Sequence, residues 1–202
     1  MPSTIRPHKA CRTLATLLAA SFAALALPAL ASAASCASSA TSHPFAQFGD
    51  NAAYSLVQGG SFESGATGWS LSHASVVNGN ERYSVAGGSH SLEIQPNGEA
   101  VSPAFCVSSE YPSFRFFQRQ TSGSWAVLNV IMRWTDSSGT THETTTGSLQ
   151  TGTSWAVSPV MQLGSSLPVQ GGGTVQVRLV FKPEPYGGAW AIDDVYLDPY
   201  RR

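Results

Sequence analysis

The stretch Ala189-Trp-Ala-Ile-Asp-Asp-Val-Tyr-Leu-Asp-Pro199 decides the fold of this chain. Its branched and aromatic residues predict a β-strand that ends at the proline. Successive side chains of a strand point to opposite faces, so Trp190 and Ile192 share one face while Val195 and Leu197 fall on the other. If all four face one core, an extra residue must lie between the two pairs. We therefore predict a β-bulge at the Asp-Asp dipeptide between them.

The predicted bulge turns a carboxylate of Asp193 or Asp194 inward or along the edge of the sheet. A carboxylate beside a core keeps its charge only if it has a partner. Backbone N–H groups or an arginine are one kind of partner, and a metal ion is another. The residues of the strand alone do not distinguish these possibilities.

Residues 1–33 are predicted to be a signal peptide. Three basic residues precede an apolar run at residues 14–30, and Ala31-Ser32-Ala33 is a small-residue cleavage site. The run is short for a membrane anchor, and a lipid anchor on Cys36 is the minor alternative. We expect a secreted protein that has no membrane association after cleavage.

The exported part, residues 34–202, suits one domain with a sizeable core. Three of the 11 Lys and Arg residues lie in the leader, and all 12 Asp and Glu residues lie after it, so the exported net charge is −4. This charge argues against nucleic acid as a partner. We expect the exported domain to be a monomer.

Two cysteines, Cys36 and Cys106, remain after cleavage. In an oxidising compartment we expect them to pair, with two free buried thiols as the alternative. The bridge would stabilise the fold by about 4 kcal/mol through the entropy of the unfolded chain. It would also fasten an irregular N-terminal arm, residues 34–53, to a strand.

Residues 54–202 are predicted to form one β-domain with no helix. Alternating side chains between turn signals predict about ten short strands, which is typical of a sandwich or barrel. Tight turns are predicted at Asn78-Gly79-Asn80 and at Pro96-Asn97-Gly98. The predicted strands span residues 54–58, 69–77, 91–94, 100–107, 114–119, 127–134, 140–146, 155–163, 175–182 and 190–197.

Three motifs resemble those of galactose-binding-like jelly rolls, of which carbohydrate-binding modules of the CenC type are the best-known members. Leu56-Val-Gln-Gly-Gly-Ser-Phe-Glu63, followed by Trp69, is similar to their opening N-G-x-F-E…G-W motif. Gly88-Ser-His-Ser-Leu-Glu-Ile94 is similar to their G-x-x-S-L-x-L strand, and residues 190–197 match their closing strand. The resemblance implies a jelly-roll β-sandwich of two antiparallel sheets, with the first and last strands adjacent.

The same resemblance implies a structural Ca²⁺ ion. Its ligands would be the Glu63 carboxylate, a carbonyl near His90, and the carboxylate of Asp193 or Asp194. The chemistry agrees, because Ca²⁺ binds six to eight oxygen atoms. The alternative is that the two aspartates accept backbone N–H groups or pair with an arginine, without a metal.

Several polar residues of the central strands lie on the side opposite the core-facing residues. Arginine binds sugar hydroxyls, carboxylates and sulfates with its planar fork, and a phenylalanine can stack on a sugar ring. We therefore hypothesise a concave glycan-binding sheet face. The alternative is that these arginines pair with cross-strand acids or aid solubility. The residues are Arg115, Phe117, Arg119, Asn129, Arg133 and Arg178.

The tryptophans divide by position. Trp69, Trp134 and Trp190 are expected in the core. Three aromatic residues near predicted loops are candidates for sugar-stacking platforms: Trp125, Trp155 and Tyr186.

Catalytic motifs are absent from the sequence, which has no G-x-S-x-G, H-E-x-x-H or P-loop pattern. The first hypothesis is therefore a secreted, non-catalytic module that binds a polysaccharide or a cell-surface glycan. An extracellular structural or protein-interaction domain without a sugar site is the second. A hydrolase of unrecognised type is the third.

Overall fold

The structure is a computed structural model that describes Met1 and residues 40–150, 152–167 and 173–199. The rest of the predicted signal peptide and Cys36 lie outside the described residues. Cys106 takes part in a disulfide bond, and its pairing with Cys36 stays a prediction. In the part that is described, no helix has the length and hydropathy to cross a membrane.

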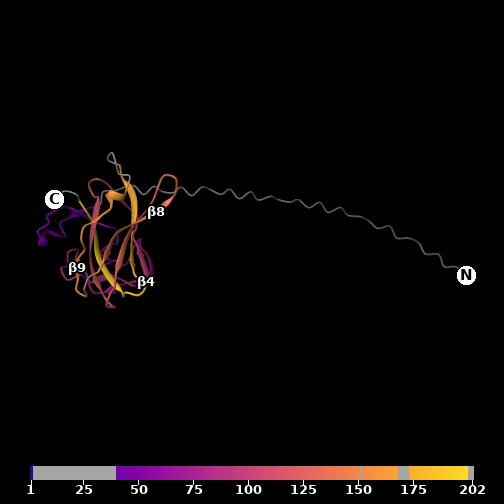
Figure 1. Ribbon diagram of the computed structural model, residues 1–202, viewed down its shortest axis with the longest axis horizontal. Helices are drawn as coiled ribbons and strands as arrows, with labels where there is room; N and C mark the ends of the chain where they lie inside the picture. The colour runs from indigo at the N-terminus through magenta and orange to yellow at the C-terminus, as the bar shows by residue number, and fades with distance from the viewer. Residues whose placement is uncertain (2–39, 151, 168–172, 200–202) are drawn as a thin grey trace. The chain divides into compact units, whose positions relative to one another are not determined.

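The described chain is almost entirely β-structure, as predicted, with two 3₁₀ turns and no α-helix among these residues (Figure 1). The elements are β1 (Thr41–Ser42), η1 (Ala46–Phe48), β2 (Tyr54–Leu56), β3 (Ser70–Asn78), β4 (His90–Val101), β5 (Phe105–Val107), β6 (Ser113–Gln120), β7 (Leu128–Thr135), β8 (Thr141–Leu149), β9 (Ala156–Val157), β10 (Met161–Gln162), η2 (Gly164–Ser166), β11 (Val175–Pro183) and β12 (Trp190–Asp198).

All pairings between these strands are antiparallel, and they form two layers that share β4. One layer contains β2, β12 and β6, with β9 and β10 on the far side of β6. The other runs β3-β4-β11-β7-β8, with β5 beside β11. The first half of β4 pairs with β12 and its second half with β11. One hydrogen-bond network therefore joins both layers.

The two layers pack face to face around the main hydrophobic core. Phe116 on β6 and Phe181 on β11 meet with ring centroids 5.0 Å apart, although their strands are not paired. Both side chains are fully buried, and such burial stabilises a fold by about 1.5–3 kcal/mol per large apolar side chain. The predicted all-β jelly-roll sandwich is confirmed.

Strand β12 lies at the centre of its layer, and all nine of its residues are buried. It pairs with β2 at one end, so the first and last strands of the domain are adjacent, as predicted. Its register with β6 shifts between Asp193 and Tyr196, and Asp194 has a φ of 49°. The predicted bulge is therefore present. It brings both Ile192 and Val195 into the main core.

The turn predicted at residues 96–98 is wrong, because β4 runs through it without a break. Asn97 has a φ of 61°, and His73 on the neighbouring β3 has a φ of 46°. The register of the two strands shifts between Ser72 and Ala74. A Cβ at Gly98 would lie 2.6 Å from the His73 carbonyl oxygen. The glycine therefore permits a bulge between paired strands instead of a chain reversal.

Two further expectations about connections are wrong. The tight turn at residues 78–80 is a longer loop, residues 79–89, closed by a hydrogen bond from the Gly79 N–H to the Ser89 carbonyl oxygen at 2.8 Å. The single strand predicted at residues 155–163 is divided into β9 and β10 around Pro159. Proline has no N–H to donate to a ladder, which explains the interruption.

A second hydrophobic cluster covers the outward side of β6 and β12. Its covering residues come from the N-terminal arm and from loop 79–89, which supplies Tyr83 and Val85. This outer cluster has as its buried members Phe45, Tyr54, Phe117, Trp155, Ala191 and Tyr196.

Candidate functional site

The six residues predicted to line one glycan-binding face lie on opposite sides of the sandwich. Three point outward from β6, because their neighbours along the strand belong to the main core: Arg115, Phe117 and Arg119. Three point outward from β7 and β11 in the other layer: Asn129, Arg133 and Arg178. We name these two surfaces the β6 face and the β7 face. The core separates them, so the prediction of a single shared face is wrong.

The β6 face is covered, which removes two of the predicted sugar contacts. Phe117 has no exposed surface and packs 5.9 Å from the ring of Phe45. It therefore cannot stack on a sugar. Trp155, expected near a loop, is 8% exposed and lies under the guanidinium of Arg119 at 5.0 Å. Strand parity correctly placed Phe117 outward but could not reveal the segments above it.

The β7 face leaves its polar residues at least partly exposed, although Val180 among them is fully buried, and these polar residues pair with neighbouring groups. Arg133 Nε donates to Glu143 at 2.6 Å, and a second nitrogen of the same guanidinium lies 3.7 Å from Glu99. Arg178 donates to the Ser102 carbonyl oxygen at 2.9 Å, and Asn129 accepts from the Ser148 hydroxyl at 2.6 Å. The contacts of Arg133 match the alternative interpretation of pairing with cross-strand acids, in which an exposed ion pair stabilises the fold by about 0–1 kcal/mol.

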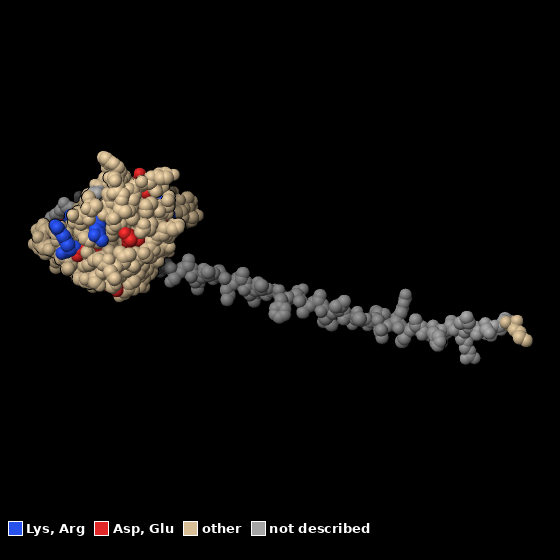
Figure 2. Space-filling view, turned by 90° about the horizontal axis from the view of Figure 1, so that it is seen from below, with Lys and Arg blue, Asp and Glu red and all other residues tan. Residues whose placement is uncertain are grey.

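Charges on the surface of the domain are sparse. On the face shown in Figure 2, basic and acidic side chains form small groups on a surface that is otherwise uncharged. No extended patch of one sign is visible on that face, which agrees with the low charged fraction of the sequence, 11%.

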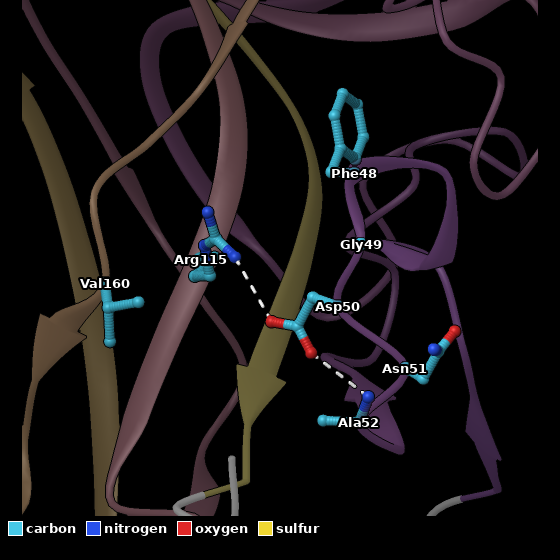
Figure 3. A pocket seen from close by; sticks show the side chains of 7 residues that line it. All are labelled: Phe48, Gly49, Asp50, Asn51, Ala52, Arg115 and Val160. Carbon is cyan, nitrogen blue, oxygen red and sulfur yellow. Dashed lines mark hydrogen bonds and ion pairs between the residues drawn. The ribbon is translucent and has the colours of Figure 1, made fainter.

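A pocket of about 770 Å³ opens between the N-terminal arm and the β6 face (Figure 3). The arm contributes its rim, Arg115 comes from β6, and Val160 lies opposite in the connection between β9 and β10. The volume lies within the usual range of small-ligand sites, about 300–1,000 Å³. The lining residues are Phe48, Gly49, Asp50, Asn51, Ala52, Arg115 and Val160.

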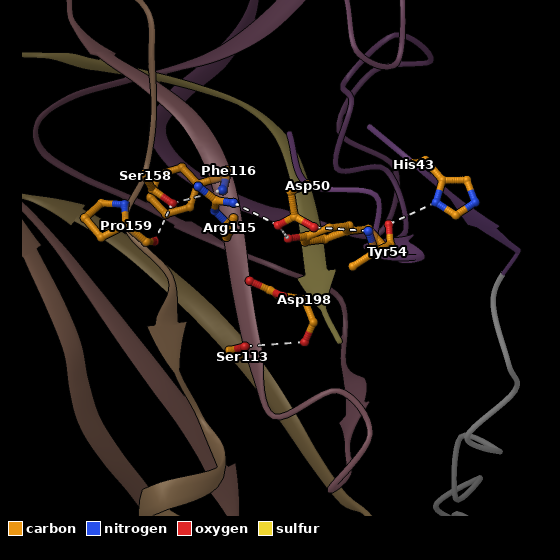
Figure 4. Close-up of polar contacts among 10 residues, drawn as sticks. His43, Asp50, Tyr54, Ser113, Arg115, Phe116, Ser158, Pro159 and Asp198 are labelled. Carbon is orange, nitrogen blue, oxygen red and sulfur yellow. Dashed lines mark hydrogen bonds and ion pairs between the residues drawn. The ribbon is translucent and has the colours of Figure 1, made fainter. Parts of the chain in front are cut away.

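The charged pair in this pocket is held in place from several sides. Arg115 Nη1 lies 3.6 Å from Asp50 Oδ2, and the guanidinium lies over the ring of Phe45 at 4.8 Å. Asp50 also accepts the Tyr54 hydroxyl at 2.7 Å (Figure 4) and the Ala52 N–H at 3.0 Å (Figure 3). Burial, followed by the hydrogen bond to Asp50, raises the pKa of Tyr54 above its ordinary value. The hydroxyl therefore stays protonated and donates to the carboxylate.

Arg115 and Asp50 are partly buried but remain accessible, with 20% and 23% of their side chains exposed. Asp198 lies close by in the same view and is almost completely buried (Figure 4). A guanidinium fork and a carboxylate at a partly dry surface can exchange hydrogen bonds with vicinal hydroxyl groups. Phe48, which is 43% exposed at the rim, adds an aromatic ring.

The arm reaches this position through a compact local fold. Strand β1 pairs with β2, and η1 ends at Gly49, whose φ of 83° reverses the chain toward the sheet. His43 Nδ1 lies 2.8 Å from the Asn51 carbonyl oxygen and closes the segment. Sequence reasoning identified Arg115 but missed Phe48 and Asp50. The Gly49-Asp50 pair, a turn signal just before β2, could have drawn attention to them.

The four residues predicted as metal ligands gather around loop 79–89. Glu63 accepts the N–H groups of Ser89 and His90 at 2.8 and 2.7 Å. Asp193 accepts the Glu81 N–H at 3.1 Å, and Asp194 accepts the Ala86 N–H at 3.3 Å. Both aspartates are fully buried. The backbone N–H groups of this loop and of His90, at the start of β4, are thus the observed hydrogen-bond partners of the three carboxylates.

Glu81 is a fourth carboxylate at this place and was not predicted. It is 1% exposed and accepts the N–H groups of Tyr83 and Val85 at 2.5 and 2.7 Å. Burial and the neighbouring carboxylates raise the pKa of Asp193 to about 8 and that of Asp194 to about 7. The like charges therefore disfavour full ionisation of the group.

Asp194 retains one unsatisfied atom, because its Oδ1 is buried and has no hydrogen-bond partner among the described residues. An unpaired carboxylate oxygen beside other carboxylates fits the chemistry of a calcium ligand. The side chains do not form a complete metal site as they stand, because no three His, Cys, Asp or Glu residues of the described chain lie close enough together to hold an ion.

Comparison with solved structures finds carbohydrate-binding modules with the same fold. The CBM22-1 xylan-binding domain from Paenibacillus barcinonensis Xyn10C is 15% identical, with 82% of this chain and 99% of that chain covered and a TM-score of 0.51. The CBM22-1-CBM22-2 tandem domain of the same protein is 15% identical, with 82% of this chain and 47% of that chain covered and a TM-score of 0.52. The CBM22-1-GH10 modules of Clostridium thermocellum Xyn10B are 13% identical, with 70% of this chain and 28% of that chain covered and a TM-score of 0.50.

No family model and no curated protein matches the chain. Because the identities to the solved structures are this low, the likeness establishes the fold and does not assign a ligand. The chain therefore has the jelly-roll β-sandwich of carbohydrate-binding modules, as the resemblance implied.

Proposed function

We propose that this chain is an exported, monomeric, non-catalytic domain that binds the glycan of a polysaccharide or cell surface in the pocket of Arg115. The observation that carries the proposal is the pocket itself, which combines an oriented Arg115–Asp50 pair with the half-exposed ring of Phe48. Carbohydrates present vicinal hydroxyls, which the Arg115–Asp50 pair can bind, and apolar C–H faces, which the ring of Phe48 can contact. The fold supports the proposal as an analogy.

The test is a polysaccharide microarray followed by calorimetry on the best ligand. Arg115→Lys keeps the charge but loses the planar fork, so we expect affinity to fall about tenfold or more. Arg133→Lys is the matched control on the β7 face and should bind like wild type. A loss only in Arg133→Lys would move the site to the β7 face, and equal losses in both variants would contradict a site confined to the pocket.

The two other candidate functions have direct readouts. Release of reducing sugar from any polysaccharide on the array would identify a hydrolase. Failure to bind any glycan, with capture of an extracellular protein through the same pocket, would support an interaction domain. Export is tested by the N-terminal sequence of the secreted protein, which should begin at Ala34.

A structural calcium ion at the bulge of β12 is a second proposal. It is supported by the unpartnered Oδ1 of Asp194 and by the carboxylates of Glu63 and Asp193 nearby. Calcium would supply the positive charge that this group of like charges lacks. We expect a rise of several degrees in Tm in millimolar CaCl₂ relative to EDTA, lost in Asp194→Asn. An unchanged Tm would contradict the proposal.

A further inference from the structure

Two aromatic residues on neighbouring loops are almost fully exposed. Trp125 lies between β6 and β7 and is 87% exposed, and Tyr186 lies between β11 and β12 and is 101% exposed. Aromatic side chains commonly bury 150–250 Å² each in a fold, so leaving two of them in water forgoes considerable hydrophobic stabilisation. Neither residue belongs to the pocket of Arg115 or to the carboxylates at the bulge.

The two loops pack backbone against backbone through glycines. A Cβ at Gly187 would lie 2.8 Å from the Ala126 Cα and 3.2 Å from the Trp125 carbonyl oxygen. A Cβ at Gly123 or Gly188 would overlap the main chain of the opposite loop. Side chains at these positions would force the loops apart. The glycines therefore bring the segments that carry Trp125 and Tyr186 into direct contact.

Hydrogen bonds fix the same pair of loops. The Glu184 N–H donates to the Val127 carbonyl oxygen at 2.9 Å, and the Thr121 N–H donates to the Ala189 carbonyl oxygen at 2.8 Å. The Ala189 N–H donates to the Ser122 hydroxyl at 3.0 Å. Backbone that is already ordered loses little conformational entropy on binding. The rings thus stand on a preorganised support.

We propose that Trp125 and Tyr186 form a second carbohydrate contact, a stacking platform for the pyranose rings of a neutral polysaccharide. The class of ligand rests on the proposed function, whereas the location is independent of the Arg115 pocket. An indole and a phenol offer flat apolar surfaces to the C–H faces of sugar rings, and their polar edges remain hydrated. Two such rings on adjacent loops suit a chain of sugars better than a single residue.

The composition of the loops favours a neutral ligand. Residues 121–127 and 184–189 contain one charged residue, Glu184, and no lysine or arginine. Acidic polymers and anionic lipid surfaces attract basic segments, which these loops lack. A stable protein interface buries about 800 Å² on each partner. The other exposed large apolar side chains of the described fold, Phe48 and Leu71, belong to the arm and to β3 and do not extend this surface. The two rings alone therefore suit a sugar chain better than a protein partner.

The experiment is affinity gel electrophoresis of the mature protein in xylan, mannan, β-glucan and galactan. The double variant Trp125→Ala, Tyr186→Ala is compared with Arg115→Lys and with Trp125→Phe, Tyr186→Phe. We expect the alanine pair to lose about tenfold or more in affinity, and the phenylalanine pair to retain most of it. The urea midpoint should be unchanged in both, because the side chains are exposed.

The outcomes separate the two sites. An alanine pair that migrates like wild type while Arg115→Lys loses retardation overturns the platform and leaves the pocket. The reverse result supports the platform and overturns the pocket. A wild type that none of the four polysaccharides retards contradicts both. A further outcome is that the protein binds no sugar but sediments with phosphatidylcholine and phosphatidylserine vesicles, and that this sedimentation depends on Trp125. This result would overturn the platform in favour of a membrane contact.

Discussion

The β6 face and the β7 face carry similar alternating sequence patterns but have different surroundings. At outward positions, Phe117 on β6 is fully buried, whereas Ile131 on β7 remains partly exposed. Arg115 is paired with Asp50 from the distant arm, and Arg133 is paired with Glu143 from the next strand. The pattern of a strand thus determines the direction of a side chain. On the β6 face, the covering segments bury the outward apolar side chains.

This difference also explains where a pocket can form. A bare antiparallel sheet whose long polar residues pair across strands offers little depth. On the β6 face, the arm meets the sheet along an uneven boundary, and the gap left between them is the pocket of Arg115 (Figure 3). Charges there interact in a lower effective dielectric than charges on the open face.

The largest expected effect concerns the cover of the β6 face. Phe45 is fully buried and its ring lies 4.6 Å from Tyr54 and 5.9 Å from Tyr196. Truncation in Phe45→Ala removes these contacts and leaves a cavity, so we expect the free energy of unfolding to fall by about 3–5 kcal/mol. Ile131→Ala on the open face should lose about 1 kcal/mol or less. Urea denaturation of both variants measures the difference.

Similar losses in the two variants would break the comparison, because they would mean that the arm contributes no more than an exposed side chain. A variant of Phe45 that fails to fold is replaced by Phe45→Leu, for which the loss should be smaller but still exceed that of Ile131→Ala.

The sequence predicts the sandwich well because its signals are local. The phase change within residues 189–199 predicted the bulge, and the same four apolar residues are found in one core. Pairing of β2 with β12 followed from the resemblance of the terminal motifs. Periodicity also oriented Arg115 and Arg133 correctly. Each of these statements depends on a few neighbouring residues and on the period of a strand.

The candidate site was predicted only in part, because it depends on contacts between distant segments. Asp50 meets Arg115 across 65 positions of sequence, and no local pattern links them. The covering role of loop 79–89 was hidden because Asn78-Gly79-Asn80 carries the signal of a tight turn. Glu81 has no special pattern in the sequence. Its role becomes visible only when its carboxylate is seen to bind the N–H groups of its own loop.

The pH dependence of stability should come mainly from Asp193 and Asp194, the two buried carboxylates that contact the loop covering the β6 face. This loop donates N–H groups to Asp193 and Asp194, whose pKa values are raised to about 8 and about 7 by burial and like charges. Between about pH 4 and pH 8 the folded protein then binds more protons than the unfolded chain. In EDTA, the free energy of unfolding should therefore fall as pH rises through this window, by about 2 kcal/mol or more, and level off above it.

Urea denaturation at several pH values tests this expectation, with Asp193→Asn as the comparison, which should show a smaller slope. Calcium would hold the carboxylates ionised, so in CaCl₂ the decline should shrink. Stability that rises with pH between 5 and 8 in EDTA would show that the N–H donors of the loop outweigh burial and repulsion.

The smallest expected effect separates the two arginine pairs. Arg133 Nε lies 2.6 Å from Glu143, closer than the 3.6 Å between Arg115 and Asp50. Distance alone would make the Arg133 pair the stronger. Exposure argues the opposite, because 48% of the Glu143 side chain is in water against 23% for Asp50.

In double-mutant cycles with alanine we expect a coupling of about 0.5 kcal/mol or less for Arg133–Glu143 and about 1 kcal/mol or more for Arg115–Asp50. Since salt screens exposed charges most, 1 M NaCl should abolish the first coupling and reduce the second only in part. A stronger Arg133–Glu143 coupling that survives 1 M NaCl would mean that the covering arm does not change the electrostatics of the face beneath it.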